Sequence, residues 1–165
     1  MNITRFFKHL LIPDWAARRA FSSKDLFNIE KAIKSSENEH IGELRFVVEG
    51  TLPLHYLFSE KRIRQRAQEL FSQLRVWDTE HNSGVLIYVQ LVDRRIEIVA
   101  DRGINAKVEQ AQWAAVCRTM EKSFKDGKFA EGALEAIARI TQLIVGHFPL
   151  RGANPNELSD KPVVL

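Results

Sequence analysis

Four carboxylate side chains lie just outside three predicted strands, where they could hold a divalent cation. They are Glu39, Glu43, Asp78 and Asp101. Carboxylates that are brought together repel each other unless a cation, an arginine or a shared proton relieves them. Calcium or magnesium would do this, because both ions prefer oxygen ligands. Arg45, Arg102 or His81 could do it within the protein, so a purely structural role, in which the acids cap loops and pair with neighbours, stays open.

A predicted hairpin and the polar residues on either side of it indicate why these acids should lie close together. A polar loop over 78–84 leads into an unbroken apolar run, 85–89, and a tight turn at 93–94 follows. Alternation over 95–100 then ends at the polar residues 101–103. This pattern predicts a buried strand, a hairpin and a second strand. Because hairpin strands are antiparallel, the loop before the first and the residues after the second should meet at one end of a sheet.

A third strand should place its start at that same end. Alternation over 43–49 predicts a strand with one polar side, and a helix over about 59–74 connects it to the apolar run 85–89. A strand reached through a helix is expected to be parallel, with a right-handed crossover. The residues just before 43 should therefore lie beside the 78–84 loop.

The remaining patterns complete a fold class and a domain organisation. Apolar residues at helical spacing predict helices from Ser22, whose capping box includes Asp25, and over 113–127 and 129–147. The order predicts an α/β/α sandwich with a mixed central sheet and helices on both faces. The predicted units are an N-terminal basic amphipathic arm over 1–20, the domain over 21–148 and an extended C-terminal tail over 149–165.

The opposite end of the sheet is a second candidate location for a site. In open α/β sheets, ligands usually bind beyond the carboxyl ends of the parallel strands. The residues there are Glu49, Gly50, Thr51, Asp93, Arg94 and Arg95. They offer fewer convergent groups than the acidic end, which we therefore prefer. Basic residues on the intervening helix predict a solvated face, and these are Lys61, Arg62, Arg64 and Arg66.

Charge and composition narrow the classes of partner. Residues 1–19 carry Arg5, Lys8, Arg18 and Arg19 against Asp14, a balance of 4 − 1 = +3, which equals the formal charge of the whole chain. The rest of the chain is therefore neutral, whereas nucleic-acid binding would favour a basic face on the folded body. The amphipathic arm could contact a membrane surface or a protein partner, or it could pack on its own body or a second copy.

The single cysteine and the hydropathy pattern indicate a compartment. Cys117 can form no intrachain disulfide and lies on an apolar helix face, as a small buried thiol does. No run of about 18 apolar residues occurs, which predicts no transmembrane span. We expect a cytoplasmic protein that could associate with a membrane.

Several of these residues resemble the TPM domain family, which is named after thylakoid-lumen, photosystem-repair and channel-modulator proteins. The resemblance covers about 22–148 and centres on the run 82–87 (NSGVLI), followed by 93–98 (DRRIEI) and the spacing onward to Trp113. Ser83 stands where the family has glycine, and Gly103 stands where it usually has a glycine pair. The matching positions are Asn82, Gly84, Asp101 and Gly103.

The resemblance implies a fold and two kinds of activity. It implies an α/β/α sandwich in a soluble bacterial-type member. Family members have been connected with divalent-cation binding and acid phosphatase activity, and many act beside membrane complexes. For this chain it implies an interaction or regulatory domain with a calcium or magnesium site, acting beside a membrane or protein complex. A weak metal-dependent acid phosphatase is the alternative.

The residues themselves limit what kind of phosphatase is conceivable. Cys117 is not followed by an arginine six residues later, and the chain has no Asp-x-Asp-x-Thr, Arg-His-Gly or glycine-rich phosphate loop. What remains is hydrolysis assisted by a metal on the four acids, with Arg45 or Arg102 steadying the phosphate.

Overall fold

A computed structural model describes residues 9, 19–57, 61–152 and 154–165 of the chain. The predicted N-terminal arm, apart from His9, Arg19 and Ala20, and the predicted cap at Ser59 lie outside these residues. The described elements, in chain order, are α3 (Ser23–Ser36), β1 (Glu43–Glu49), η1 (Leu54–Tyr56), α4 (Lys61–Gln73), β2 (Gly84–Gln90), β3 (Arg95–Ala100), α5 (Arg102–Asn105), α6 (Gln110–Lys125), α7 (Phe129–Val145) and β4 (Val163–Val164).

The sheet has the order β3-β2-β1-β4 and is mixed. β1 is parallel to β2, with Glu43 opposite Gly84, and β2 is antiparallel to β3, with Val85 opposite Ala100. Both orientations confirm the predictions from the connections. The parallel pair follows from the crossover through α4, and the antiparallel pair follows from the short turn after Gln90.

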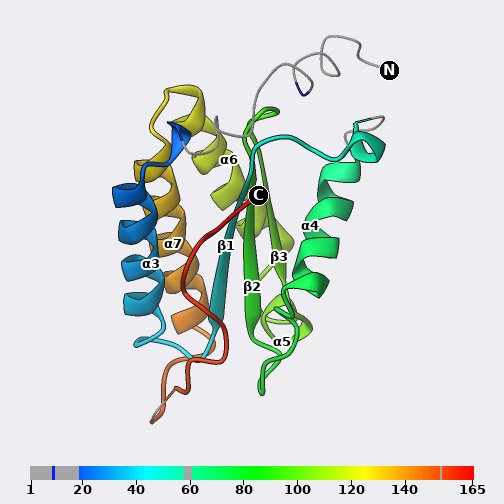
Figure 1. Cartoon of the computed structure of the whole chain (residues 1–165). Coiled ribbons are helices and arrows are strands. Elements are labelled where there is room, and N and C mark those ends of the chain that lie inside the picture. The colour runs from blue at the N-terminus through cyan, green and yellow to red at the C-terminus, as the bar shows by residue number, and fades with distance from the viewer. Residues whose placement is uncertain (1–8, 10–18, 58–60, 153) are drawn as a thin grey trace.

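Helices cover both faces of this sheet and confirm the α/β architecture (Figure 1). The larger core lies on the face covered by α3, α6 and α7, and alternate strand residues such as Phe46, Ile87 and Ile98 point into it. The opposite core, under α4, takes the intervening residues, including Val47, Leu86 and Val99. Strand residues alternate between the two cores because successive side chains of a β-strand point to opposite faces of the sheet.

The α3 helix forms as its sequence indicates. The hydroxyl of Ser22 accepts the Asp25 N–H at 3.2 Å, and the Asp25 carboxylate accepts the Ser22 N–H at 2.9 Å. This reciprocal capping box satisfies main-chain donors that the first turn would otherwise leave unpaired. Ile29 and Ile33 then lie fully buried against the core.

The polar side of β1 is covered by other parts of the chain. Glu43 and Glu49, which the alternation predicted on the polar side of the strand, are both buried. The reason is that α4 and the C-terminal residues cover that side of β1. The last residues extend the sheet as β4, which pairs parallel to β1 through Val163 and Val164. In Figure 1 this segment, drawn in red, runs across the front of the sheet.

Among the described residues, no helix combines the length and the apolar composition that crossing a bilayer requires.

Candidate functional site at the rim of the sheet

The site is built at the end of the sheet where β1 and β2 begin and β3 ends, which we call the rim. There the Glu43 N–H donates to the Ser83 carbonyl at 3.1 Å, and the Asp101 N–H donates to the Gly84 carbonyl at 2.8 Å. The Gly103 N–H donates to the Asn82 carbonyl at 3.1 Å. The three segments expected to converge therefore do so through main-chain hydrogen bonds. The rim is the lower end of the molecule in Figure 1.

One group of predicted residues forms a compact knot between the 78–83 loop and α5. Asp101 caps α5, because its Oδ1 accepts the Arg102 N–H at 2.7 Å. The Arg102 Nε donates to the Asn82 Oδ1 at 3.1 Å. Asn82 adopts a positive φ of 51°, a conformation that asparagine tolerates better than most residues. The knot brings together the five residues Asn82, Gly84, Asp101, Arg102 and Gly103.

Two glycines permit this close approach. A Cβ atom on Gly84 would lie 1.8 Å from the Val76 carbonyl oxygen, a distance that atoms cannot adopt. A Cβ atom on Gly103 would lie 2.6 Å from the Asn82 carbonyl oxygen and 2.7 Å from that of His81. These positions therefore need glycine because the neighbouring backbone occupies the space of a side chain.

The second oxygen of Asp101 is the unusual atom of the knot. Its Oδ2 is buried and has no hydrogen-bond partner within the described part of the chain. A buried carboxylate oxygen without a partner is costly, so such an atom calls for a water, an ion or a ligand group. The carbonyl oxygens of His81 and Asn82 approach Gly103, the second residue of the helix that Asp101 caps.

A second group of acids lies inside the rim rather than on it. Glu43 is fully buried, and its Oε2 accepts the Leu158 N–H at 3.0 Å. Burial raises the pKa of Glu43 to about 7. The Glu37 Oε1 accepts the Leu44 N–H at 2.9 Å, and burial raises the pKa of Glu37 to about 9, with Glu43 and Asp160 adding to the rise. Desolvation disfavours the charged form of both carboxyls.

The C-terminal segment 154–161, which we call the strap, closes over these acids. The Asn154 Nδ2 donates to the carbonyls of Glu37 and His40 at 3.4 and 3.3 Å. The Arg45 guanidinium donates to the Ser159 carbonyl and, at 3.1 Å, to the Lys161 carbonyl. The strap therefore provides the polar partners that the buried side of β1 requires.

His40 is also enclosed. Its side chain is fully buried, its Nδ1 accepts the Gly42 N–H at 3.1 Å, and its Nε2 has no hydrogen-bond partner among the described residues. Burial lowers the pKa of His40 to about 4. A histidine in this environment is neutral near pH 7, because desolvation disfavours the imidazolium.

A cavity of about 400 Å³ opens between the strap and the loop after α4. Charged groups of both signs line it, namely Arg45, Arg75, Asp78 and Glu157. Two of these, Arg45 and Asp78, are predicted site residues. Arg75 has a positive φ of 53°, and Trp77 beside Asp78 is half exposed. The arrangement can hold a small ligand that carries both charged and polar groups.

The rim does not gather the four predicted carboxylates into one group. No set of three or more His, Cys, Asp or Glu side chains among the residues described is placed to hold a metal ion. Glu43 is buried under the strap, Asp78 lines the cavity, and Asp101 caps α5. Glu39 is exposed beside a groove between α3 and α7. Binding of an ion by fewer of these acids stays a prediction.

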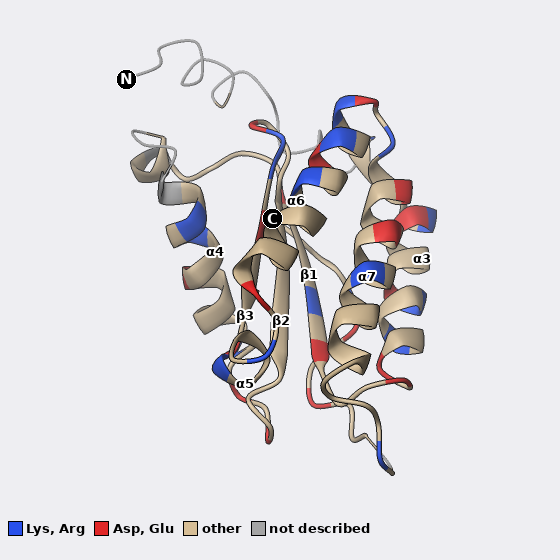
Figure 2. Ribbon diagram, turned by 180° about the vertical axis from the view of Figure 1, so that it is seen from behind, with Lys and Arg blue, Asp and Glu red and all other residues tan. Residues whose placement is uncertain are grey.

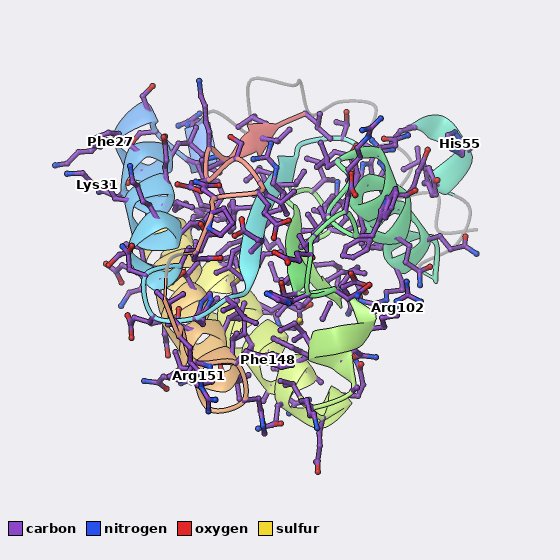
Figure 3. All side chains as sticks on the ribbon, turned by 90° about the horizontal axis from the view of Figure 1, so that it is seen from below. Phe27, Lys31, His55, Arg102, Phe148 and Arg151 are labelled. Atoms are coloured by element: carbon purple, nitrogen blue, oxygen red, sulfur yellow. The ribbon has the colours of Figure 1, made fainter. Side chains whose placement is uncertain are left out.

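The charge distribution and the view from below agree with this separation. Acidic residues occur on several different loops at the rim (Figure 2). Seen from the rim end, Arg102 projects near α5, whereas Phe148 and Arg151 lie beside the end of α7 (Figure 3). Arg102 and Arg151 thus lie on different elements at this end of the molecule.

The role of the strap residues was not predicted from the sequence. Asn154, Glu157 and Asp160 were part of the predicted extended tail, where no periodicity indicates a role. The available signal was a short polar run between Pro155 and Pro162 that precedes the apolar end of the chain. Such a run can serve as a loop that leads into a short strand.

The opposite end of the sheet holds a charged network that joins Glu49 to Arg66, a pairing that the sequence pattern did not predict. The Glu49 carboxylate is buried and accepts Arg66 Nη2 at 2.7 Å and Arg66 Nε at 3.1 Å. The Tyr88 hydroxyl also donates to Glu49, and Arg66 Nη1 donates to Glu69 at 3.1 Å. The prediction of a solvated face on α4 is therefore wrong for Arg66, because its guanidinium pairs with the buried Glu49 carboxylate of β1.

Comparison with known proteins identifies a family and a fold. A family model of the TPM domain matches residues 17–143. The BA42 protein of the psychrophilic bacterium Bizionia argentinensis has a similar solved structure, with a TM-score of 0.75 and 26% identity over 87% of this chain and 94% of that one.

A second solved structure supports the fold alone. It is the N-terminal domain of a protein from P. gingivalis, with a TM-score of 0.63 and 17% identity over 86% of this chain and 95% of that one. A search of curated protein sequences finds no match.

Proposed function

This chain belongs to the TPM domain family, and on that premise we propose that it is a regulatory or interaction domain that binds a divalent cation at its rim. In this proposal the cation, calcium or magnesium, is bound at the knot around Asp101. The domain then acts beside a protein complex or a membrane surface, which it contacts through residues 1–19.

The observation that carries the cation proposal is the buried, unpartnered Oδ2 of Asp101. A hard divalent ion would supply the missing partner, and main-chain carbonyl oxygens commonly complete such a coordination shell. The carbonyl oxygens of His81 and Asn82 lie against Gly103, two residues after Asp101, and the Asn82 carbonyl also accepts the Gly103 N–H.

A binding role also fits the other rim acids. Glu43 and Glu37 already use their oxygens to hold main-chain N–H groups of the strap and of β1. Groups committed in this way stabilise a surface rather than activate a water. Within residues 1–19, His9 contacts the body of the domain, because its Nδ1 accepts the Leu52 N–H at 3.1 Å and its Nε2 lies 3.3 Å from Asp93. These contacts place His9 at the end of the sheet opposite the rim.

Calorimetric titration tests the cation site. We expect calcium or magnesium to bind the full-length protein and to raise its Tm, because a ligand that binds only the folded state stabilises it. Asp101→Asn should weaken this binding by about tenfold or more, since it removes a ligand charge. Asp126→Asn provides the matched control, because Asp126 is an exposed acid at the end of α6, where the chain turns into α7.

Two results would contradict the cation proposal. One is the absence of heat and of a Tm change with both ions. The other is equal loss of binding in the Asp126→Asn control.

For the membrane contact, a chain lacking residues 1–8 should lose co-sedimentation with anionic vesicles. Unchanged co-sedimentation would leave a protein partner as the function of this segment.

The second candidate function is a weak metal-dependent phosphomonoesterase. The specific observation in its favour is the cavity, where Arg45 and Arg75 could hold a phosphate near the Asp78 carboxylate. A chromogenic phosphate ester should then be hydrolysed only with calcium, magnesium or manganese, and Asp78→Asn and Arg75→Gln should abolish turnover. Metal binding without turnover would support the binding domain instead.

A further inference from the structure

Side chains of the flanking helices bind the main-chain groups on the outer edge of β3, where another strand would normally pair. β3 is the terminal strand of the sheet on the side of α5 and α6. The Asp101 N–H points to β2, because it donates to Gly84. Since main-chain groups alternate in direction along an antiparallel strand, those of Ile96, Ile98 and Ala100 point away from β2.

Three side chains from the flanking helices meet these outward groups. The Ile96 N–H donates to Oε1 of Glu121, on α6, at 3.3 Å. The main chain at Ile98 contacts the sulfur of Cys117, also on α6. The Ile98 carbonyl accepts a hydrogen bond from Arg64, on α4. Two helices thus contact the same edge strand from opposite faces of the sheet.

These side chains line a groove of about 300 Å³ along β3. Arg64 and Glu121 are only partly buried, with side-chain exposures of 37% and 21%. Both are long side chains that can rotate into solvent, so a competing backbone could replace their hydrogen bonds. An edge strand with displaceable side-chain partners is a template for strand addition.

The charges in the groove indicate the kind of strand that would fit. Arg64 lies 3.3 Å from Glu97, and Arg95 lies 3.5 Å from Glu121, so four charges are paired. Arg118 also lines the groove and is exposed, and it forms no ion pair within the described part of the chain. The groove therefore has an excess positive charge that a carboxylate of the ligand can neutralise.

We propose that the groove along β3 binds an extended polypeptide segment that carries acidic side chains and pairs with the Ile96 N–H, the Ile98 carbonyl and the outward main-chain groups of Ala100, while the Ile98 main chain keeps its contact with Cys117. The segment displaces the ends of Arg64 and Glu121, and its carboxylates contact Arg118 and the released Arg64. The site is separate from the rim, so this inference does not depend on the cation proposal.

The test uses the full-length, ¹⁵N-labelled protein and two capped heptapeptides, one alternating valine with glutamate and one alternating valine with lysine. We expect saturable shifts of the Ile96, Ile98 and Ala100 amide signals with the acidic peptide. The lysine peptide should bind at least about tenfold more weakly, because it places like charges together. Arg118→Glu should reverse this preference.

Two further variants separate strand pairing from simple charge attraction. Ala100→Pro removes one outward N–H without removing a bond to β2, as edge strands allow, and should weaken the acidic peptide by about tenfold. Arg151→Glu, at an exposed position near the end of α7, should leave the affinity unchanged. Spectra of each free variant check that the fold is retained.

Several outcomes would overturn the proposal. They are no saturable binding at millimolar acidic peptide, shifts confined to other elements, equal affinity for both peptides, and an unchanged affinity of Arg118→Glu. Self-association of the free protein through β3 would assign the edge to a second copy of the chain instead.

Discussion

The Glu43 carboxylate and the Leu158 main-chain N–H lie 3.0 Å apart, although 115 positions separate these residues in the chain. This hydrogen bond joins the first residue of β1 to the strap. It explains why a carboxylate can be fully buried at the start of a central strand, because the strap supplies donors that water would otherwise supply. The buried acid and the C-terminal segment therefore depend on each other.

The first prediction concerns this bond. Glu43→Ala should lower the free energy of unfolding by about 1–3 kcal/mol, because the Leu158 N–H loses its acceptor. Hydrogen exchange at the Leu158 and Leu165 amides should become faster, since the strap leads into β4. Glu80→Ala is the control, because the Glu80 side chain is exposed and makes no hydrogen bond or ion pair among the described residues, and it should change stability by no more than about 0.5 kcal/mol. Equal protection of the strap amides from hydrogen exchange in both variants would contradict the dependence of the strap and the buried Glu43 on each other.

The second prediction concerns alkaline pH. Burial raises the pKa of Glu37 from 4.5 to about 9, so the folded state holds this proton at pH values where the unfolded state has lost it. The resulting contribution to stability is complete below pH 4.5 and is lost as the pH rises through about 9. The free energy of unfolding should therefore decrease between pH 7 and 9.5.

Urea denaturation across that range measures the effect. This range avoids His40, whose pKa is lowered to about 4 and whose contribution changes only below about pH 6.5. Glu37→Gln keeps the hydrogen-bonding shape and cannot ionise, so its stability should vary less with pH. If the free energy of unfolding of Glu37→Gln decreased with pH as steeply as that of the natural chain, the pH dependence would come from other groups.

The third prediction concerns the close approach at Gly84. Gly84→Ala should destabilise the protein by about 3 kcal/mol or more, because the new Cβ would lie 1.8 Å from the Val76 carbonyl oxygen. Gly146→Ala is the control, since its Cβ would meet atoms at 3.6 Å or farther and its φ is −60°. That change should be neutral or stabilising by up to about 1 kcal/mol. Comparable Tm values for the two variants would contradict the packing argument.

The convergence of the rim could be predicted from the sequence because it depends on local rules. The hairpin turn makes β2 and β3 antiparallel, and the helix between β1 and β2 makes those strands parallel. These two orientations alone place Glu43, Gly84 and Asp101 at one end of the sheet. The same rules say nothing about side-chain direction on the loops, so they could not predict that the acids would point apart.

The burial of Glu43 and Glu49 could not be predicted, because it depends on partners far away in the chain. Glu43 is covered by the strap, and Glu49 is paired with Arg66 of α4. Alternation within β1 indicates only which residues share a face. Whether that face is solvated depends on what packs on it, which local patterns do not contain.

The last prediction concerns the pair of Glu49 and Arg66. The two side chains are 4% and 12% exposed, and Arg66 Nη2 lies 2.7 Å from Glu49 Oε1. Arg66→Ala should cost about 3–5 kcal/mol, because it leaves a buried carboxylate without its cation. Arg139→Ala is the matched control, since Arg139 pairs with Glu135 on the surface of α7 at 47% and 46% exposure. Its loss should cost no more than about 0.5 kcal/mol. The double variant Glu49→Gln with Arg66→Ala should recover part of the stability lost in Arg66→Ala, because no buried charge then remains unpaired. Chemical denaturation of the natural chain and the three variants measures these differences. Equal costs of Arg66→Ala and Arg139→Ala would show that the Glu49 pair is no more important to the fold than a solvated one.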